Sequence, residues 1–170
     1  MNPTPLTNFA VDRDNRKINV VREFEAPLPL VWAAWTESEL LDQWWAPKPW
    51  QAKTKRMDFS EGGYWLYAMM GPEGEVHWAR SDFRSIAPLQ SYTALDGFCD
   101  EHGNVNTGLP RSLWATVFTG GENRARVNIE ITFDKLEDLE EIIRMGFKEG
   151  FTAGLENLDH LLSTQSQPRR

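Results

Sequence analysis

The sequence predicts an α+β fold in which a curved antiparallel sheet of seven strands wraps around one long C-terminal helix. Three observations lead to this prediction. One strand-like segment is followed by two short helical segments, then by six segments rich in strand-forming residues and separated by turns, and finally by a long segment with helical periodicity. Because an antiparallel sheet with one solvated face must cover its other face, the long helix is expected to provide that cover.

One domain is expected, and it spans residues 17–163. The preceding residues 1–16 contain Pro3 and Pro5 and show no apolar period, so they are expected to form a flexible arm. The polar tail 164–170 is expected to be disordered. A chain of 170 residues is long enough to bury a substantial core.

Two short helices are expected directly after the first strand, which covers residues 17–25 with alternating side chains. Pro27 and Pro29 suit the first turn of a helix, where backbone amides lack partners in any case. The second short helix, 39–45, is expected to end before Pro47.

The middle of the chain is expected to form the rest of the sheet. The expected strands are 51–59, 64–70, 75–86, 90–98, 112–119 and 124–133. Glycine-containing turns at 71–74 and 120–123 predict two hairpins. The polar segment Asp100–Arg111 is the longest loop expected between strands.

The C-terminal segment 134–164 has the pattern of one continuous helix with an apolar face. Its apolar residues recur at three- and four-residue steps: Leu136, Leu139, Ile142, Ile143, Phe147, Phe151, Leu155, Leu158, Leu161 and Leu162. Gly146, Gly150 and Gly154 interrupt it, and each costs about 1 kcal/mol relative to alanine. Either a neighbouring element packs closely against these glycines, or they leave room for a ligand.

The composition excludes several classes of protein. A net charge of −7 without a long basic run argues against nucleic-acid binding, and no apolar stretch is long enough to span a membrane. The N-terminal residues lack the apolar core of a signal peptide, and the lone cysteine, Cys99, fits a reducing cytoplasm, so a cytoplasmic protein is expected. The three histidines share no ligand spacing, so no metal and no cofactor are expected.

Eight tryptophans are more than a core of this size requires. They are Trp32, Trp35, Trp44, Trp45, Trp50, Trp65, Trp78 and Trp114. Tryptophan buries a large area and keeps one polar N–H group. Two interpretations stay open: a large aromatic core, or an aromatic wall around an apolar cavity.

A set of ordered motifs gives the chain a family resemblance. The motifs are Ala26-Pro27, Val31–Thr36, Leu40–Trp45 with its Trp44-Trp45 pair, Asp58, Gly62–Trp65, Ile86–Pro88, and Gly150-Phe151 followed by Leu155, Leu158 and Leu161. In this order they resemble the family named for the activator of heat-shock protein 90 ATPase, within the START-like superfamily (SRPBCC, or Bet v 1-like). The resemblance covers about residues 17–162 and implies a helix-grip fold. It also implies a choice of roles, since these proteins include co-chaperone domains, lipid carriers, hormone receptors and polyketide cyclases.

We expect a small apolar or amphipathic molecule to bind in a cavity between the sheet and the last helix. The residues expected to line this site are Trp65, Tyr67, Met69, Trp78, Arg80, Phe98, Trp114, Phe147, Gly150 and Phe151. Aromatic side chains would supply apolar burial, while Tyr67 or Arg80 would orient the ligand. The loop Asp100–Pro110 is a candidate lid.

The inward face of strand 75–86 is left open by its sequence. Trp78, Arg80 and Asp82 share one face with Arg84, while His77, Ala79, Ser81 and Phe83 share the other. In the alternative to a ligand contact, Arg80, Asp82 and Arg84 form a solvated ladder of charges across the strands.

Two other functions are weighed. A co-chaperone or partner-binding module requires an exposed apolar patch. An enzyme of the cyclase or isomerase type requires a desolvated Asp or His that points inward beside a tyrosine, with Tyr67 and Asp82 as candidates. A monomer or weak dimer is expected.

Overall fold

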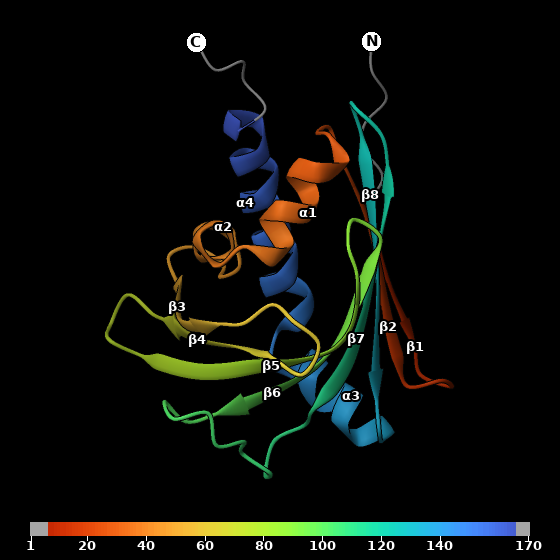
Figure 1. Ribbon diagram of the computed structural model, residues 1–170. Coiled ribbons are helices and arrows are strands. Elements are labelled where there is room, and N and C mark those ends of the chain that lie inside the picture. The colour runs from red at the N-terminus through yellow and green to blue at the C-terminus, as the bar shows by residue number, and fades with distance from the viewer. Residues whose placement is uncertain (1–6, 166–170) are drawn as a thin grey trace.

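The structure is a computed structural model that describes residues 7–165. In chain order the elements are β1 (Thr7–Asp12), β2 (Lys17–Phe24), α1 (Leu28–Thr36), α2 (Ser38–Trp44), β3 (Gln51–Met57), β4 (Tyr64–Met70), β5 (Val76–Ala87), β6 (Ser91–Cys99), β7 (Ser112–Gly120), β8 (Ala125–Phe133), α3 (Leu136–Arg144) and α4 (Phe147–Gln165). The predicted α+β class is confirmed, with a curved antiparallel sheet and a long C-terminal helix (Figure 1).

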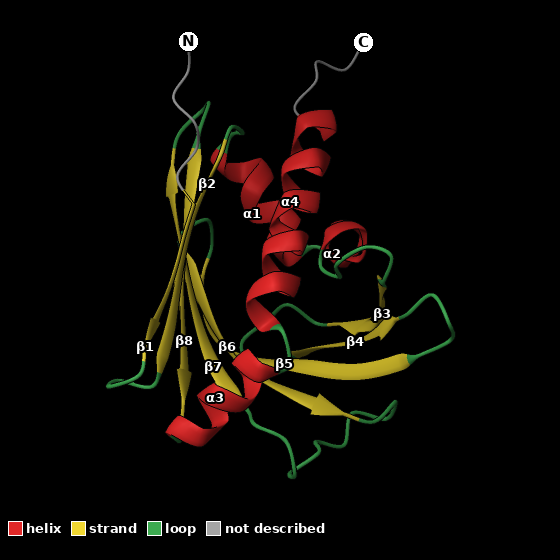
Figure 2. Ribbon diagram, turned by 180° about the vertical axis from the view of Figure 1, so that it is seen from behind, coloured by secondary structure: helices red, strands yellow, loops and turns green. Residues whose placement is uncertain are grey.

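The strands form a single antiparallel sheet in the order β1-β2-β8-β7-β6-β5-β4-β3. The sheet bends so strongly that β1, β2 and β8 stand as one wall while β3, β4 and β5 form another (Figures 1 and 2). Register shifts between Thr54 and Arg56 and between Phe83 and Ser85 interrupt the pairing in the second wall. Helix α4 lies in the hollow between the walls, and α1 and α2 close one end.

The sheet has eight strands rather than the predicted seven, because residues 7–12 form β1 instead of a flexible arm. Opposite β2, Phe9 pairs with Val20 and Val11 with Ile18, so two apolar side chains join the core face. The alternation of apolar residues in β1 is confined to one short segment close to two prolines, so the sequence did not predict this strand. Residues 1–6 and 166–170 lie outside the described part of the chain.

The predicted continuous C-terminal helix is divided in two at Gly146. The backbone of Gly146 has φ of +90°, a left-handed conformation that ends α3. Its N–H donates to the Ile143 carbonyl at 3.0 Å, and its carbonyl accepts from the Gly150 N–H at 3.0 Å. The chain therefore turns at Gly146 and starts α4 in a new direction, as Figure 2 shows.

Close packing explains another of the three glycines. A Cβ atom on Gly154 would lie 3.2 Å from the Trp45 carbonyl oxygen and 3.3 Å from that of Trp44. Nearby, Asn157 Nδ2 donates to the Ala46 carbonyl at 3.0 Å. Helix α4 thus packs closely against the backbone at the end of α2. Of the two explanations for the helix glycines, close packing therefore applies to Gly154.

Replacing Gly146 by alanine is expected to lower the free energy of unfolding by about 1–2 kcal/mol, because alanine is strained at positive φ. Urea denaturation measures this loss. Gly150→Ala is the matched control. Its new Cβ would meet Pro47 Cγ at an ordinary 3.8 Å, so a gain of up to about 1 kcal/mol is expected from helix propensity. Equal losses in both variants would contradict the assigned turn.

Candidate functional site

Register pairing brings polar side chains from neighbouring strands into one row on the concave face of the sheet. Trp65 of β4 pairs with Ser81 of β5, and Ser81 pairs with Asp96 of β6. The parallel row next to it contains Phe83, Ala94 and Trp114. A carboxylic acid therefore lies on the same face as the aromatic core.

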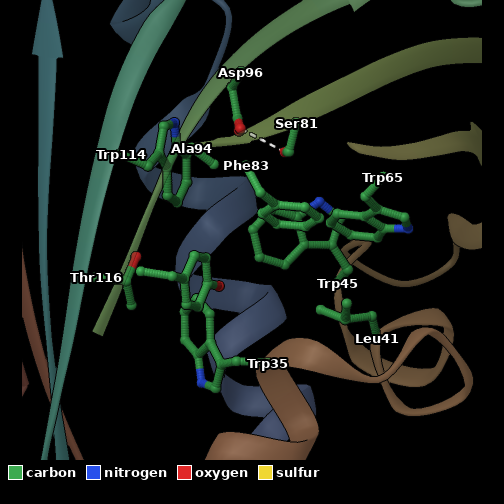
Figure 3. Close-up of a pocket in the computed structure, with 11 residues that line it drawn as sticks. Trp35, Leu41, Trp45, Trp65, Ser81, Phe83, Ala94, Asp96, Trp114 and Thr116 are labelled. Carbon is green, nitrogen blue, oxygen red and sulfur yellow. Dashed lines mark hydrogen bonds between the residues drawn. The ribbon is translucent and has the colours of Figure 1, made fainter. Parts of the chain in front are cut away.

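This part of the concave face borders a small cavity (Figure 3). Its volume is about 20 Å³, which is room for about one water molecule. The lining residues are Trp35, Leu41, Trp45, Trp65, Ser81, Phe83, Tyr92, Ala94, Asp96, Trp114 and Thr116. The cavity lies between the sheet and the short helices α1 and α2. The predicted position, between the sheet and the last helix, therefore requires correction: aromatic side chains fill the expected hollow.

Trp45 occupies the centre of the aromatic cluster. Its ring centroid lies 5.2–6.3 Å from those of six other aromatic residues, namely Trp35, Trp44, Trp65, Tyr67, Trp114 and Phe151. The indole Nε1 donates to the Tyr67 hydroxyl at 3.0 Å. Trp45 is half-buried, and its backbone packs against Gly154 of α4.

Asp96 is the ionisable group of the cavity. Ser81 Oγ donates to Asp96 Oδ1 at 2.5 Å, shown by the dashed line in Figure 3. Asp96 retains some accessible surface as a residue, but its carboxyl group is closely surrounded by protein atoms. Burial raises the pKa of Asp96 to about 7, and the hydrogen bond from Ser81 and the charge of Arg111 offset only part of that increase.

Two tyrosines respond to the same surroundings. Burial, followed by the nearby charge of Asp96, raises the pKa of both Tyr67 and Tyr92, so both stay neutral. The Thr116 hydroxyl lies near enough to Tyr92 to lower that tyrosine's pKa slightly, yet Thr116 Oγ1 makes no hydrogen bond of normal geometry to a described residue. The site thus combines the Asp96 carboxyl group, the neutral tyrosine hydroxyls, and a Thr116 hydroxyl without a hydrogen-bond partner among the described residues.

The structure places several predicted site residues in or beside the cavity. Trp65 and Trp114 line it directly. Tyr67 stacks on Trp65 with ring centroids 3.9 Å apart, and Phe151 meets Trp114 at 5.6 Å. The others lie farther away on the same side: Phe147 stacks on Phe151, Met69 packs on the core, Phe98 pairs with Ala79, and Gly150 faces Pro47.

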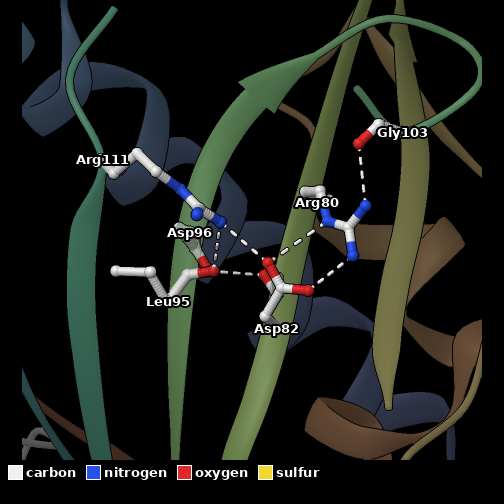
Figure 4. Close-up of polar contacts among 7 residues, drawn as sticks. Arg80, Asp82, Leu95, Asp96, Gly103 and Arg111 are labelled. Atoms are coloured by element: carbon white, nitrogen blue, oxygen red, sulfur yellow. Dashed lines mark hydrogen bonds and ion pairs between the residues drawn. The ribbon is translucent and has the colours of Figure 1, made fainter. Parts of the chain in front are cut away.

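Trp78 and Arg80 lie on the convex face of the sheet, so they do not line this cavity. The face of β5 that points inward carries Ser81 and Phe83, both of which are buried. On the convex face, Arg80 binds Asp82 through two hydrogen bonds of 2.6 and 3.2 Å, and Arg111 reaches Asp82 at 2.8 Å (Figure 4). Arg80 and Asp82 therefore pair along β5 itself, and this half-buried ion pair faces away from the cavity.

Asp82 is consequently an ion-pair partner and not a cavity acid. Desolvation alone would raise its pKa, but hydrogen bonds from Arg80 and Arg111 outweigh that effect and lower the pKa. Gly97 makes this arrangement possible, since a Cβ there would lie 2.7 Å from Arg111 Nε. The enzyme role considered for Asp82 does not fit this position.

The loop 100–110 does not cover the cavity as a lid would. The Gly103 carbonyl accepts a hydrogen bond from Arg80 at 2.8 Å, and the Glu101 carbonyl accepts one from Lys55 Nζ at 2.8 Å. Lys55 also lies over the ring of Trp78. These contacts hold the loop at the convex side of the sheet.

Within residues 7–165, no cluster of His, Cys, Asp and Glu side chains is arranged to hold a metal ion. His77 is exposed and stacks on Trp50 with ring centroids 5.4 Å apart. In the same part of the chain, no helix is long and apolar enough to cross a membrane.

A bent antiparallel sheet that grips a long C-terminal helix defines a helix-grip domain. The family described as "Activator of Hsp90 ATPase homolog 1-like protein" matches residues 25–163, and the chain belongs to this family. The resemblance noted in the sequence is therefore confirmed.

Solved structures of several bacterial proteins share this fold. A protein of Arthrobacter aurescens is 31% identical, with a TM-score of 0.87 and coverage of 92% of this chain and 91% of that one. A protein of Mycobacterium smegmatis is 30% identical, with a TM-score of 0.85 and coverage of 93% and 97%. The AHSA1 protein of Silicibacter pomeroyi, at 23% identity, a TM-score of 0.71 and coverage of 88% and 99%, shows the fold alone. No curated protein matches the chain.

Proposed function

We propose that this protein binds a small, largely apolar molecule in the aromatic cavity between the sheet and helices α1 and α2. The family and fold are consistent with a ligand-binding or a co-chaperone role. Of these two roles, we infer ligand binding, because the residues that line the cavity support it.

The observation that carries the proposal is the Asp96 carboxyl group among aromatic rings. A buried acid is costly unless it is paired, and no Lys, Arg or His side chain lines the cavity beside it. Ionisable groups with strongly perturbed pKa values concentrate at functional sites, because packing alone would favour an apolar residue. Asp96 therefore marks this cavity as more than a packing defect.

Ligand binding requires the cavity to enlarge. Pockets for small molecules usually measure about 300–1,000 Å³, far more than the 20 Å³ found here. We assign the enlargement to the ring of Trp45, which is half-buried and central to the cluster. Rotation of this ring towards solvent breaks its hydrogen bond to Tyr67 and its contacts with the neighbouring rings, and leaves the backbone contact with Gly154 in place.

The co-chaperone alternative requires an apolar patch on the surface. The large hydrophobic side chains exposed on the described residues are Val76, Leu89, Leu113, Val117, Leu136 and Met145. They are distributed over separate strands, turns and α3, and of these Leu113 and Val117 share the outer face of β7. Scattered apolar residues of this kind are normal on a soluble surface. The cavity is therefore the stronger candidate.

The enzyme alternative depends on the same cavity. Its requirement for an inward-facing, desolvated acid beside a tyrosine is met by Asp96 with Tyr67 and Tyr92, rather than by Asp82. Any acid–base reaction there first needs a molecule to enter the cavity. Binding is thus the step common to both functions.

A ligand panel tests the proposal. Lipids, flavonoids and sterols are titrated into the protein while tryptophan fluorescence is recorded, because four tryptophans line the cavity. We expect at least one compound to give a saturable change that is reduced in Trp114→Leu. The absence of a saturable response across the panel would contradict the proposed function.

A further inference from the structure

The Asp96 carboxyl group, which lines the cavity, accepts a hydrogen bond from one described residue. Asp96 Oδ1 accepts the hydrogen bond from Ser81, and no other described residue donates a hydrogen bond to this carboxyl group. An ionised carboxylate can accept several hydrogen bonds from its two oxygens. The acid therefore has unused capacity for a donor that is not part of the described chain.

The nearest cation does not fill this place. Arg111 lies on the convex side, where Nη2 donates to Asp82 at 2.8 Å and to the Leu95 carbonyl at 3.3 Å (Figure 4). It acts on Asp96 only through its charge. On the concave side, helices α1 and α2 bring apolar groups to the cavity, namely Trp35, Leu41 and Trp45.

Three indole rings line the cavity together with the Asp96 carboxyl group. Trp45 lies 5.4 Å from Trp65 and 5.9 Å from Trp114 between ring centroids, and all three line the cavity with Asp96. The face of an aromatic ring carries negative potential and attracts cations, most strongly for tryptophan. A carboxylate together with several indole rings favours a positively charged group over a neutral one.

We propose that the ligand of this cavity carries a protonated amino group, which Asp96 binds as its counter-ion within the cage of Trp45, Trp65 and Trp114. This inference rests on the proposed function and names the class of ligand. The present volume of about 20 Å³ accommodates a group the size of one water molecule, such as an ammonium group. The apolar remainder of the amine takes the space that the Trp45 ring vacates.

Binding of an amine depends on the protonation of Asp96. Its pKa of about 7 is set by burial, by Ser81 and by the opposing charges of Arg111 and Asp82. Tyr67 on β4 and Tyr92 on β6 stay neutral. The ionised fraction of an acid with a pKa of 7 rises about tenfold from pH 6 to pH 8, so amine affinity should rise by a similar factor.

Two probes of the same shape test this inference. Benzylamine is protonated between pH 6 and pH 8, and ethylbenzene replaces its ammonium group with a methyl group. Calorimetric titrations of the wild type are expected to show benzylamine binding about tenfold more tightly at pH 8 than at pH 6. Ethylbenzene should bind without such an increase, because a neutral ligand gains nothing from the ionised acid.

Two variants complete the test. Asp96→Asn is expected to abolish the pH dependence of benzylamine binding and to lower the affinity for benzylamine at least tenfold at pH 8. The same variant should bind ethylbenzene as the wild type does. Asp14→Asn, at an exposed acid, makes the same change in net charge and should leave both affinities unchanged. Tighter binding of ethylbenzene than of benzylamine at pH 8 would overturn the amine inference and leave the proposed function intact. Binding of neither probe would also overturn it, whereas the proposed function is judged by the wider panel.

Discussion

Asp96→Asn is expected to raise the free energy of unfolding at pH 8 by as much as about 4 kcal/mol and to change it little near pH 4. Burial raises the pKa of Asp96 from 3.8 to about 7 in the folded protein. Between these pH values the folded protein holds a proton that the unfolded chain has released. The contribution of Asp96 to the free energy of unfolding of the wild type is therefore fully present below about pH 4, and it is lost as the pH rises through 7.

Urea denaturation at several pH values between 5 and 8 measures this effect. Asparagine keeps an oxygen that can accept the hydrogen bond from Ser81, so the change removes the charge and little else. Asp14→Asn again serves as the control, since Asp14 is exposed. If the wild type and Asp96→Asn lose stability in parallel over this range, Asp96 is not the buried acid described above.

The result bears directly on function. An acid that lowers stability at neutral pH is retained at a cost, and such costs are typical of binding and catalytic sites. A more stable Asp96→Asn variant that no longer binds benzylamine would connect the two properties at one carboxyl group.

Trp45→Ala is expected to lower the free energy of unfolding by about 3–5 kcal/mol, with the lower end favoured because Trp45 is half-buried. The substitution removes the ring at the centre of the aromatic cluster and enlarges the cavity. In other proteins an engineered apolar cavity of about 150 Å³ binds benzene. Indole should therefore occupy the vacated space and restore part of the lost stability through binding to the folded state.

Thermal denaturation with and without indole measures the rescue. Trp78→Ala is the matched control, because it removes the same side chain from the convex face, where Trp78 is half-buried under Lys55. Indole should raise the melting temperature of Trp45→Ala and leave that of Trp78→Ala unchanged. Equal stabilisation of both variants would show that Trp45 does not fill the ligand site.

Most of the fold was predictable because local patterns and turns agree with the tertiary structure. The turns at 71–74 and 120–123 join strands where expected, and β2, β4 and β8 match their predicted segments closely. The break at Gly146 was missed because the apolar period continues across it, from Ile143 to Phe147. Arg144 followed closely by a glycine is nevertheless a typical helix end.

The candidate site was harder to predict because it depends on contacts between distant segments. Asp96 carried a signal, since it alternates with Tyr92 and Ala94 on one face of a predicted strand. Trp45 was one of eight tryptophans and of the Trp44-Trp45 pair, but the sequence did not indicate its central place, which depends on how α2 docks against α4. The inward face of β5 was ambiguous in sequence, and its register with β4 and β6 resolves it.

The most direct test of ligand binding in the cavity is an NMR titration of the ¹⁵N-labelled wild type that follows the indole N–H signals, assigned with single Trp→Phe variants. With benzylamine at pH 8, we predict saturable shifts at Trp45, Trp65 and Trp114, which line the cavity, described by one dissociation constant. Trp78, on the convex face, and Trp50, which stacks on exposed His77, should not respond. Saturable shifts confined to Trp50 or Trp78 would contradict the account.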